Sequence, residues 1–139
     1  MHRSLVNELI AEEVERARAD DLLRERVRLE HEGTRVLAHA RRPDRDVLLA
    51  LDGPNYNAEA FALMALDPQT REPLPGPSWP PGLAFGGDHP VLVRPWSCLR
   101  GTYEYYRHPS HVAESWDQDR YGRELPTLLR HLLDKAGCQ

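Results

Sequence analysis

The segment from Pro68 to Pro95 constrains the fold of this chain more than any other feature. It contains eight prolines and four glycines. Proline lacks a backbone N–H and fixes φ, so it interrupts helix interiors and the hydrogen-bonded ladders of a sheet. Regular structure is therefore expected before and after this segment. A long irregular stretch inside a compact domain is more often functional than ornamental, and this one leads directly to Cys98.

The remaining composition sets the size and the class of the protein. A chain of 139 residues is long enough for one hydrophobic core, so we expect a single domain over residues 1–139. The net charge is −4 and charges of both signs are interspersed, which excludes nucleic acid as an expected partner. The N-terminus lacks an apolar signal core, and no run approaches the ~20 apolar residues of a membrane span. We expect a cytoplasmic protein with no membrane partner.

In the first half of the chain, the spacing of the apolar residues changes from a helical pattern to a strand pattern. Ser4 is a good N-cap for a helix over about residues 5–22, and Glu13 falls on its charged face. The apolar face of this helix is predicted to carry Leu5, Leu9, Val14 and Ala17. Alternating and apolar runs bounded by turn residues then predict strands near residues 26–32, 35–41, 47–51 and 58–66. A helix followed by a four-strand antiparallel meander is an α+β fold.

Helical patterns return after the proline-rich segment. Ser110 is predicted to cap a short helix that carries Val112 and Trp116. A stripe with i, i+3, i+4 spacing predicts a C-terminal helix, with Pro126 in its first turn and Gly137 at its end. The residues of that stripe are Leu125, Leu128, Leu129, Leu132 and Leu133.

Four side chains within fourteen residues can carry chemistry: Cys98, Glu104, His108 and His111. A thiolate, a carboxylate and two imidazoles can bind zinc tetrahedrally. The same groups suit a cysteine nucleophile, with the histidines and the carboxylate lowering the pKa of the thiol, relaying protons or binding an oxyanion. A third interpretation is purely structural: a buried inert cysteine, a solvated carboxylate paired with Arg100 or Arg107, and capping or surface histidines. Spacing alone does not choose among them.

The second cysteine, Cys138, lies one residue from the end of the chain, where a disulfide would constrain only the C-terminal tail. We therefore expect Cys98 to be free and reduced.

The order of these features resembles the ubiquitin-conjugating (UBC) fold. That family has a first helix, a four-strand meander, a proline-rich segment, a His-Pro-Asn motif, an active-site cysteine, a tryptophan and C-terminal helices. Here the counterparts after the meander are His89-Pro90-Val91, Cys98-Leu99, Trp116 and the leucine-rich helix. The segment from Tyr56 to Pro68 is similar to the family's fourth-strand signature. The resemblance covers nearly the whole chain and implies that Cys98 is the active-site cysteine of a proline-rich loop.

A narrower resemblance concerns the Cys-Glu-His-His order of the four side chains. It is similar to the predicted metal-binding "CEHH" domain of bacterial operons that also encode ubiquitin-like proteins and a ThiF-like activating enzyme. Together the two resemblances imply an enzyme that accepts a ubiquitin-like protein as a thioester on Cys98 and transfers it to an amine of a target protein. Its partners would be the ubiquitin-like protein, the activating enzyme and the target. The operon likeness also implies a role in antiphage defence.

Under this hypothesis Cys98, Glu104, His108 and His111 are catalytic and no cofactor is required. The alternative is a non-catalytic module in the same pathway, either a UBC-like adaptor or a zinc-binding domain with these four residues as ligands. An unrelated α+β binding domain is the third possibility.

One departure from the family matters: Val91 stands where the family has an asparagine, and it cannot donate a side-chain hydrogen bond to an oxyanion. His108, His111 or a backbone N–H near Cys98 are the expected substitutes.

Lys135 is the only lysine of the chain. The simpler interpretation of this scarcity is codon bias in a GC-rich genome. Under the conjugation hypothesis, few lysines also reduce self-modification.

Overall fold

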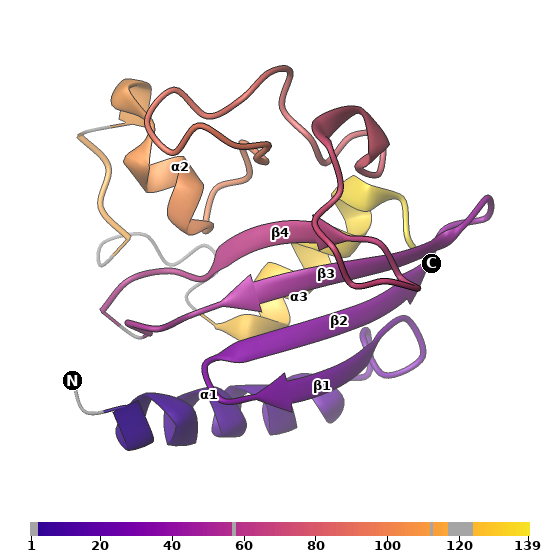
Figure 1. The fold of residues 1–139 in the computed structure, drawn as a ribbon. Helices are drawn as coiled ribbons and strands as arrows, with labels where there is room; N and C mark the ends of the chain where they lie inside the picture. Colours follow the sequence, from indigo (N-terminus) through magenta and orange to yellow (C-terminus); the bar gives the residue numbers. More distant parts are fainter. Residues whose placement is uncertain (1–2, 57, 112, 117–123) are drawn as a thin grey trace.

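The fold is a four-stranded antiparallel sheet with the N-terminal and C-terminal helices against one face (Figure 1). The computed structural model describes residues 3–56, 58–111, 113–116 and 124–139. The elements follow one another as α1 (Arg3–Arg18), β1 (Arg28–Glu32), β2 (Arg35–Arg41), β3 (Asp46–Asp52), β4 (Ala62–Leu66), η1 (Gly76–Ser78), α2 (Tyr103–Arg107), η2 (Pro109–His111) and α3 (Leu125–Ala136). None of the described helices has the length and apolarity needed to cross a bilayer. The predicted α+β class, N-terminal helix, four-strand meander and C-terminal helix are confirmed.

The sheet has the simple order β1-β2-β3-β4, with every neighbouring pair antiparallel. Its central strand β3 is buried on both faces from Val47 to Leu51, because one face packs on the helices and the other is covered by a loop. The predicted strand over residues 58–66 is too long: the backbone N–H groups of Ala58 and Glu59 bond to the carbonyl of Asn55, so a turn occupies that part and the strand begins at Ala62.

The main core lies between the sheet and the pair α1 and α3. The leucine stripe of α3 is almost fully buried there, and Gly137 ends the helix in the left-handed region at φ 72°. Pro126 occupies the first turn, as predicted. Residues 19–26, which the predicted first helix partly included, form turns instead.

Two predictions for the first helix are wrong. The buried stripe of α1 consists of Val6, Ile10, Val14 and Ala17, which recur every three or four residues and therefore lie on one face of the helix. Leu5 lies off this stripe and is 52% exposed. Ser4 lies inside the helix and does not precede it, since Arg3 is already helical.

Glu13 is the third correction, because it is buried and not on a solvated face. Its Oε1 accepts hydrogen bonds from the Tyr56 hydroxyl at 3.2 Å and from the backbone N–H of Leu125 at 3.1 Å. The second bond satisfies an N–H at the start of α3 that has no partner within the helix, so the carboxylate joins α1 to α3. Burial, followed by the charge of Glu13, raises the pKa of Tyr56.

The opposite face of the sheet carries a smaller apolar cluster of Leu37, Leu48, Ala50 and Leu66. The loop after β4 crosses this face in front of β3 and β2 (Figure 1). Arg71 in that loop pairs with Glu30 and Glu32 of β1, at 3.2 and 3.7 Å.

The predicted short helix after Ser110 does not form in the described residues. Ser110 lies inside the 3₁₀ turn η2, and its N–H bonds to Nδ1 of His108; residues 113–116 are not helical. Val112 lies outside the described residues. The helix in this region comes earlier, as α2, and its N-terminus is joined to the sheet by the bond from the Tyr103 N–H to the Phe61 carbonyl at 2.8 Å.

Candidate functional site

Cys98 follows two buried residues, Trp96 and Ser97, at the end of the proline-rich segment. It is a free cysteine with a partly buried side chain, whereas Cys138 is buried. The side chain lines a cavity of about 150 Å³. The other residues of this cavity are Gly82, Leu83, Ala84, Phe85, Ser97, Leu99 and Lys135. Of the two cysteines, Cys98 is therefore the one that is partly accessible and borders this cavity.

The charge that acts on the pKa of the Cys98 thiol is that of Glu114. Burial raises the pKa of Cys98, and the Glu114 carboxylate raises it further. That carboxylate accepts hydrogen bonds from the Tyr105 hydroxyl at 2.7 and 2.8 Å and lies 3.3 Å from Arg100 Nη2. Of the three roles considered for the histidines and the carboxylate, lowering the pKa of the thiol finds no support here, because burial and the Glu114 carboxylate both raise that pKa.

Sequence reasoning missed Glu114 because its proximity to Cys98 depends on how the chain reverses between α2 and η2. The bond from the His111 N–H to the His108 carbonyl, at 2.9 Å, and that from the Glu114 N–H to the His111 carbonyl, at 3.0 Å, make these turns. No spacing rule connects position 114 to position 98.

Glu104 is fully buried on α2, and its carboxylate serves the scaffold. Oε1 accepts the backbone N–H of Leu63 at 2.9 Å, and Oε2 pairs with Arg94 Nη2. Burial raises the pKa of Glu104, while Arg94 and the Leu63 N–H oppose that rise. This arrangement joins α2 to β4 and to the loop before Cys98. The carboxylate reaches neither His108 nor His111 through the hydrogen bonds it makes.

His89 is buried beside Glu104 and has a defined tautomer. Its Nδ1 accepts the N–H groups of Val91 at 3.1 Å and Leu92 at 3.0 Å, so the ring proton is on Nε2, which donates to the Glu104 carbonyl at 2.9 Å. The ring also lies edge-on to Trp96, with centroids 4.8 Å apart. His89 thus fixes the loop that carries Val91, whose side chain is exposed and whose N–H is already used.

The two predicted site histidines lie close together, with ring centroids 5.3 Å apart. His108 stacks on Trp96 at 5.1 Å, and His111 stacks on Tyr105 at 3.9 Å. Because Tyr105 also bonds to Glu114, one chain of contacts connects Glu114 to His111 and His108. Neither histidine lines the cavity of Cys98, and the Glu104 carboxylate faces Arg94.

The two histidines differ in the nitrogen that is available. His108 Nδ1 accepts the Ser110 N–H at 3.0 Å, so a neutral His108 carries its proton on Nε2. His111 Nδ1 donates to the Tyr105 carbonyl at 2.8 Å, so a neutral His111 has its lone pair on Nε2. Burial lowers the pKa of His108, and the charges of His111 and His89 lower it further, which favours the neutral donor form. One ring is suited to donate a hydrogen bond and the other to accept a proton.

The proposed zinc ligands do not form a converging set in the described part of the chain. No group of three or more His, Cys, Asp or Glu side chains has a geometry that could hold a metal ion among those residues. The two imidazoles are the candidate ligands that lie near each other. Zinc binding stays a prediction of the sequence.

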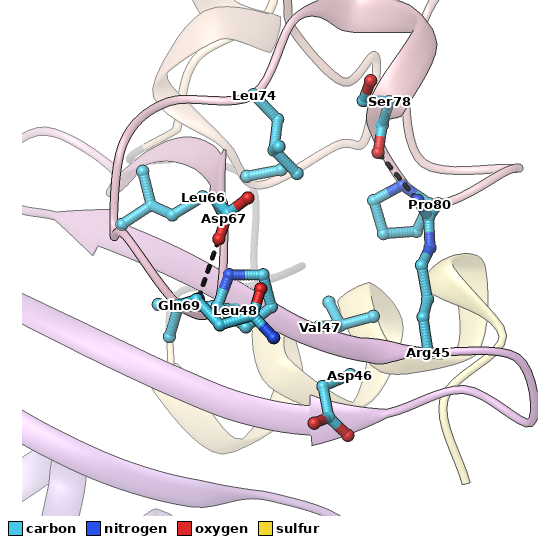
Figure 2. A pocket seen from close by; sticks show the side chains of 12 residues that line it. Arg45, Asp46, Val47, Leu48, Leu66, Asp67, Gln69, Leu74, Ser78 and Pro80 are labelled. Atoms are coloured by element: carbon cyan, nitrogen blue, oxygen red, sulfur yellow. Dashed lines mark hydrogen bonds between the residues drawn. The ribbon is translucent and has the colours of Figure 1, made fainter.

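A second hollow, of about 380 Å³, lies away from Cys98, between the loop after β4 and the outer face of the sheet. Figure 2 shows its apolar walls, which include Leu48, Leu66 and Leu74. At one end Arg45 donates to the carbonyls of Ser78 and Trp79, both at 3.0 Å. None of the predicted site residues lines this hollow.

No family model matches this chain, and no curated protein matches it. The arrangement around Cys98 is therefore interpreted from its own chemistry.

Proposed function

We propose that the protein is a ubiquitin-conjugating-like enzyme that carries a ubiquitin-like protein as a thioester on Cys98. The observation that carries the proposal is the placement of a partly exposed thiol at a cavity, directly after a proline-rich segment held by the buried His89. The order of helix, antiparallel meander, proline-rich segment, cysteine and C-terminal helix agrees with the UBC resemblance. The partly exposed thiol disfavours the interpretation as an inert core cysteine.

The first step is a thioester exchange with the activating enzyme. The Cys98 sulfur bonds to the acyl carbon of the ubiquitin-like protein, the bond to the activating enzyme's sulfur breaks, and that sulfur takes the proton that the Cys98 thiol loses. The raised pKa of Cys98 slows this attack but makes the sulfur a poorer leaving group afterwards. The same effect slows attack on the loaded thioester by water and by amines alike, so transfer to a target amine needs help from an acid and a base.

The second step is attack by an amine of the target on the thioester carbon. A carbon–nitrogen bond forms, the carbon–sulfur bond breaks, and the thiolate of Cys98 leaves. The lone pair on His111 Nε2 would take the amine proton, and the proton on His108 Nε2 would donate to the oxyanion. His108 then fills the position left by the family asparagine, because Val91 has no donor in its side chain and its N–H is bound to His89.

The charging step is tested with a ThiF-like activating enzyme, ATP and a ubiquitin-like protein. We expect a covalent adduct on a non-reducing gel that disappears with a thiol reductant. Cys98→Ala should abolish the adduct, while Cys138→Ala is the matched control because it removes the other, buried cysteine. An adduct that survives in Cys98→Ala, or that requires Cys138, would overturn the proposal.

The roles of the two histidines are tested on the preformed thioester. His108→Gln and His111→Gln should each slow discharge to a free amine by about 10²-fold, the lower range for a positioned acid or base. Charging should change less, because thioester exchange does not need an amine proton to be removed. Discharge at the wild-type rate in both variants would contradict these roles. Discharge is followed as loss of the reducible band after the activating enzyme is quenched.

A further inference from the structure

The only lysine of the chain lies at the same cavity as Cys98. Lys135 lines the 150 Å³ space together with Cys98. The cavity is small, and Cys98 and Lys135 both belong to its lining. Lys135 itself is exposed, and a lysine amine sits on a flexible four-carbon stem that can cross such a space.

The backbone of Lys135 is fixed relative to the cavity. Gly82 forms part of the cavity wall, and a Cβ at that position would lie 2.6 Å from the Lys135 carbonyl oxygen, so the end of α3 packs directly on this wall. Gly82 also has φ +91°, a conformation that a glycine adopts without strain. Arg42 Nη1 bonds to the carbonyl of Ala136, the next residue of α3. The lysine is thus anchored beside the cavity and does not sit on a loose tail.

We propose that Lys135 is an internal acceptor for the acyl group carried by Cys98. This inference rests on the proposed function, since it needs a thioester on that cysteine. The neutral amine of Lys135 attacks the thioester carbon, a carbon–nitrogen bond forms, and the carbon–sulfur bond breaks. The thiolate of Cys98 leaves and takes up the proton that the amine loses. The product is an amide on Lys135 and a regenerated thiol.

The consequence is self-modification at one defined position. An amine held at the cavity has a large advantage in effective concentration over an amine in solution. When no target amine is bound, the enzyme would transfer its cargo to itself. The modified Lys135 would then lie at the cavity that Cys98 lines.

The test uses a chemical thioester, so that it does not depend on the activating enzyme. The full chain with Cys138→Ala is incubated with a short peptide thioester that ends in glycine, and intact mass is followed before and after treatment with excess thiol. We expect a single acyl adduct that thiol removes at early times and that becomes resistant later, with the resistant adduct mapped to Lys135. Lys135→Arg should reduce the resistant adduct at least tenfold and leave the thiol-sensitive adduct unchanged.

Cys98→Ala in the same background should remove both adducts, because transfer passes through the thiol. A resistant adduct on Lys135 in that variant would mean direct acylation from solution and would overturn the inference. Loading of Cys98 without later transfer to Lys135, or no loading at all, would overturn it as well. The charging assay with the activating enzyme decides the proposed function separately: a thiol-sensitive adduct there, with no amide on Lys135, leaves the conjugating activity standing and removes only the self-modification.

Discussion

Replacing Arg94 by methionine will lower the free energy of unfolding by about 3 kcal/mol at pH 8, and by clearly less at pH 5. Arg94 pairs with Glu104, whose side chain is fully buried. Removing the cation leaves the buried carboxylate with its charge unpaired, although it still accepts the Leu63 N–H. An unpaired buried charge is among the few causes of large single-residue losses.

The pH dependence follows from the pKa of Glu104, which burial raises and Arg94 holds back. Without Arg94 that pKa rises further. A carboxyl with a raised folded-state pKa stabilises the fold while it is protonated, below its unfolded pKa, and this stabilisation is lost as pH rises through the folded value. The destabilisation of Arg94→Met is therefore largest at high pH. Urea unfolding at pH 5 and pH 8 measures it.

Two further variants separate the effect of the unpaired Glu104 charge from the effect of losing an arginine side chain. Arg94→Met combined with Glu104→Gln should recover about 1–2 kcal/mol at pH 8, because the buried group is then neutral and can still accept the Leu63 N–H. Arg24→Met is the matched control for removing an arginine, since the Arg24–Asp21 pair is exposed and should change stability by less than about 1 kcal/mol. An equal loss at both pH values would contradict the assignment to the Glu104 charge.

The scaffold was predictable from the sequence where a hydrophobic period was long and bounded by turn residues. The strand over residues 35–41 was predicted to the residue, and the helix of Leu125–Ala136 was predicted with its proline start and its glycine end. These signals are local, because turn residues and side-chain period act within a few positions. The prediction that Leu5 is buried was wrong because α1 is only weakly amphipathic. Which of the two adjacent apolar residues, Leu5 or Val6, faces the core depends on α3, which is distant in sequence.

The interior of the candidate site was less predictable, because it depends on buried polar pairs between distant residues. The Cys-Glu-His-His order, which made Glu104 a candidate site residue, is equally compatible with a catalytic carboxylate and with a carboxylate in a buried ion pair. Its partner Arg94 and its donor Leu63 lie 10 and 41 positions away. Glu13 shows the same problem, since its charge predicts solvent exposure but Tyr56 and Leu125 supply donors inside the core. From residue type alone, a glutamate is expected to be exposed to solvent. Burial of these two glutamates is possible because distant residues supply hydrogen bonds to them.

Replacing His89 by alanine will lower the free energy of unfolding by about 3 kcal/mol. The substitution leaves a cavity against Trp96 and removes the donor to the Glu104 carbonyl, which would then be buried without that partner. It also frees the loop that follows, in which Val93 is held at φ 54°, a strained conformation for a β-branched residue. The bonds from the Val93 N–H to the His89 carbonyl and from the His89 N–H to the Arg94 carbonyl, both 2.9 Å, close this loop.

The contributions of cavity and hydrogen bond can be separated. His89→Gln keeps a terminal amide donor and should lose about half as much stability as His89→Ala, while His31→Ala, which removes a histidine bonded only to the Gly33 carbonyl, should cost less than about 1 kcal/mol. Thermal unfolding of the three variants at one pH gives the comparison. If His89→Ala unfolds like the wild type, the loop before Cys98 is not held by this ring. The position of the thiol would then have to depend on the Trp96 packing and the Arg94–Glu104 pair alone.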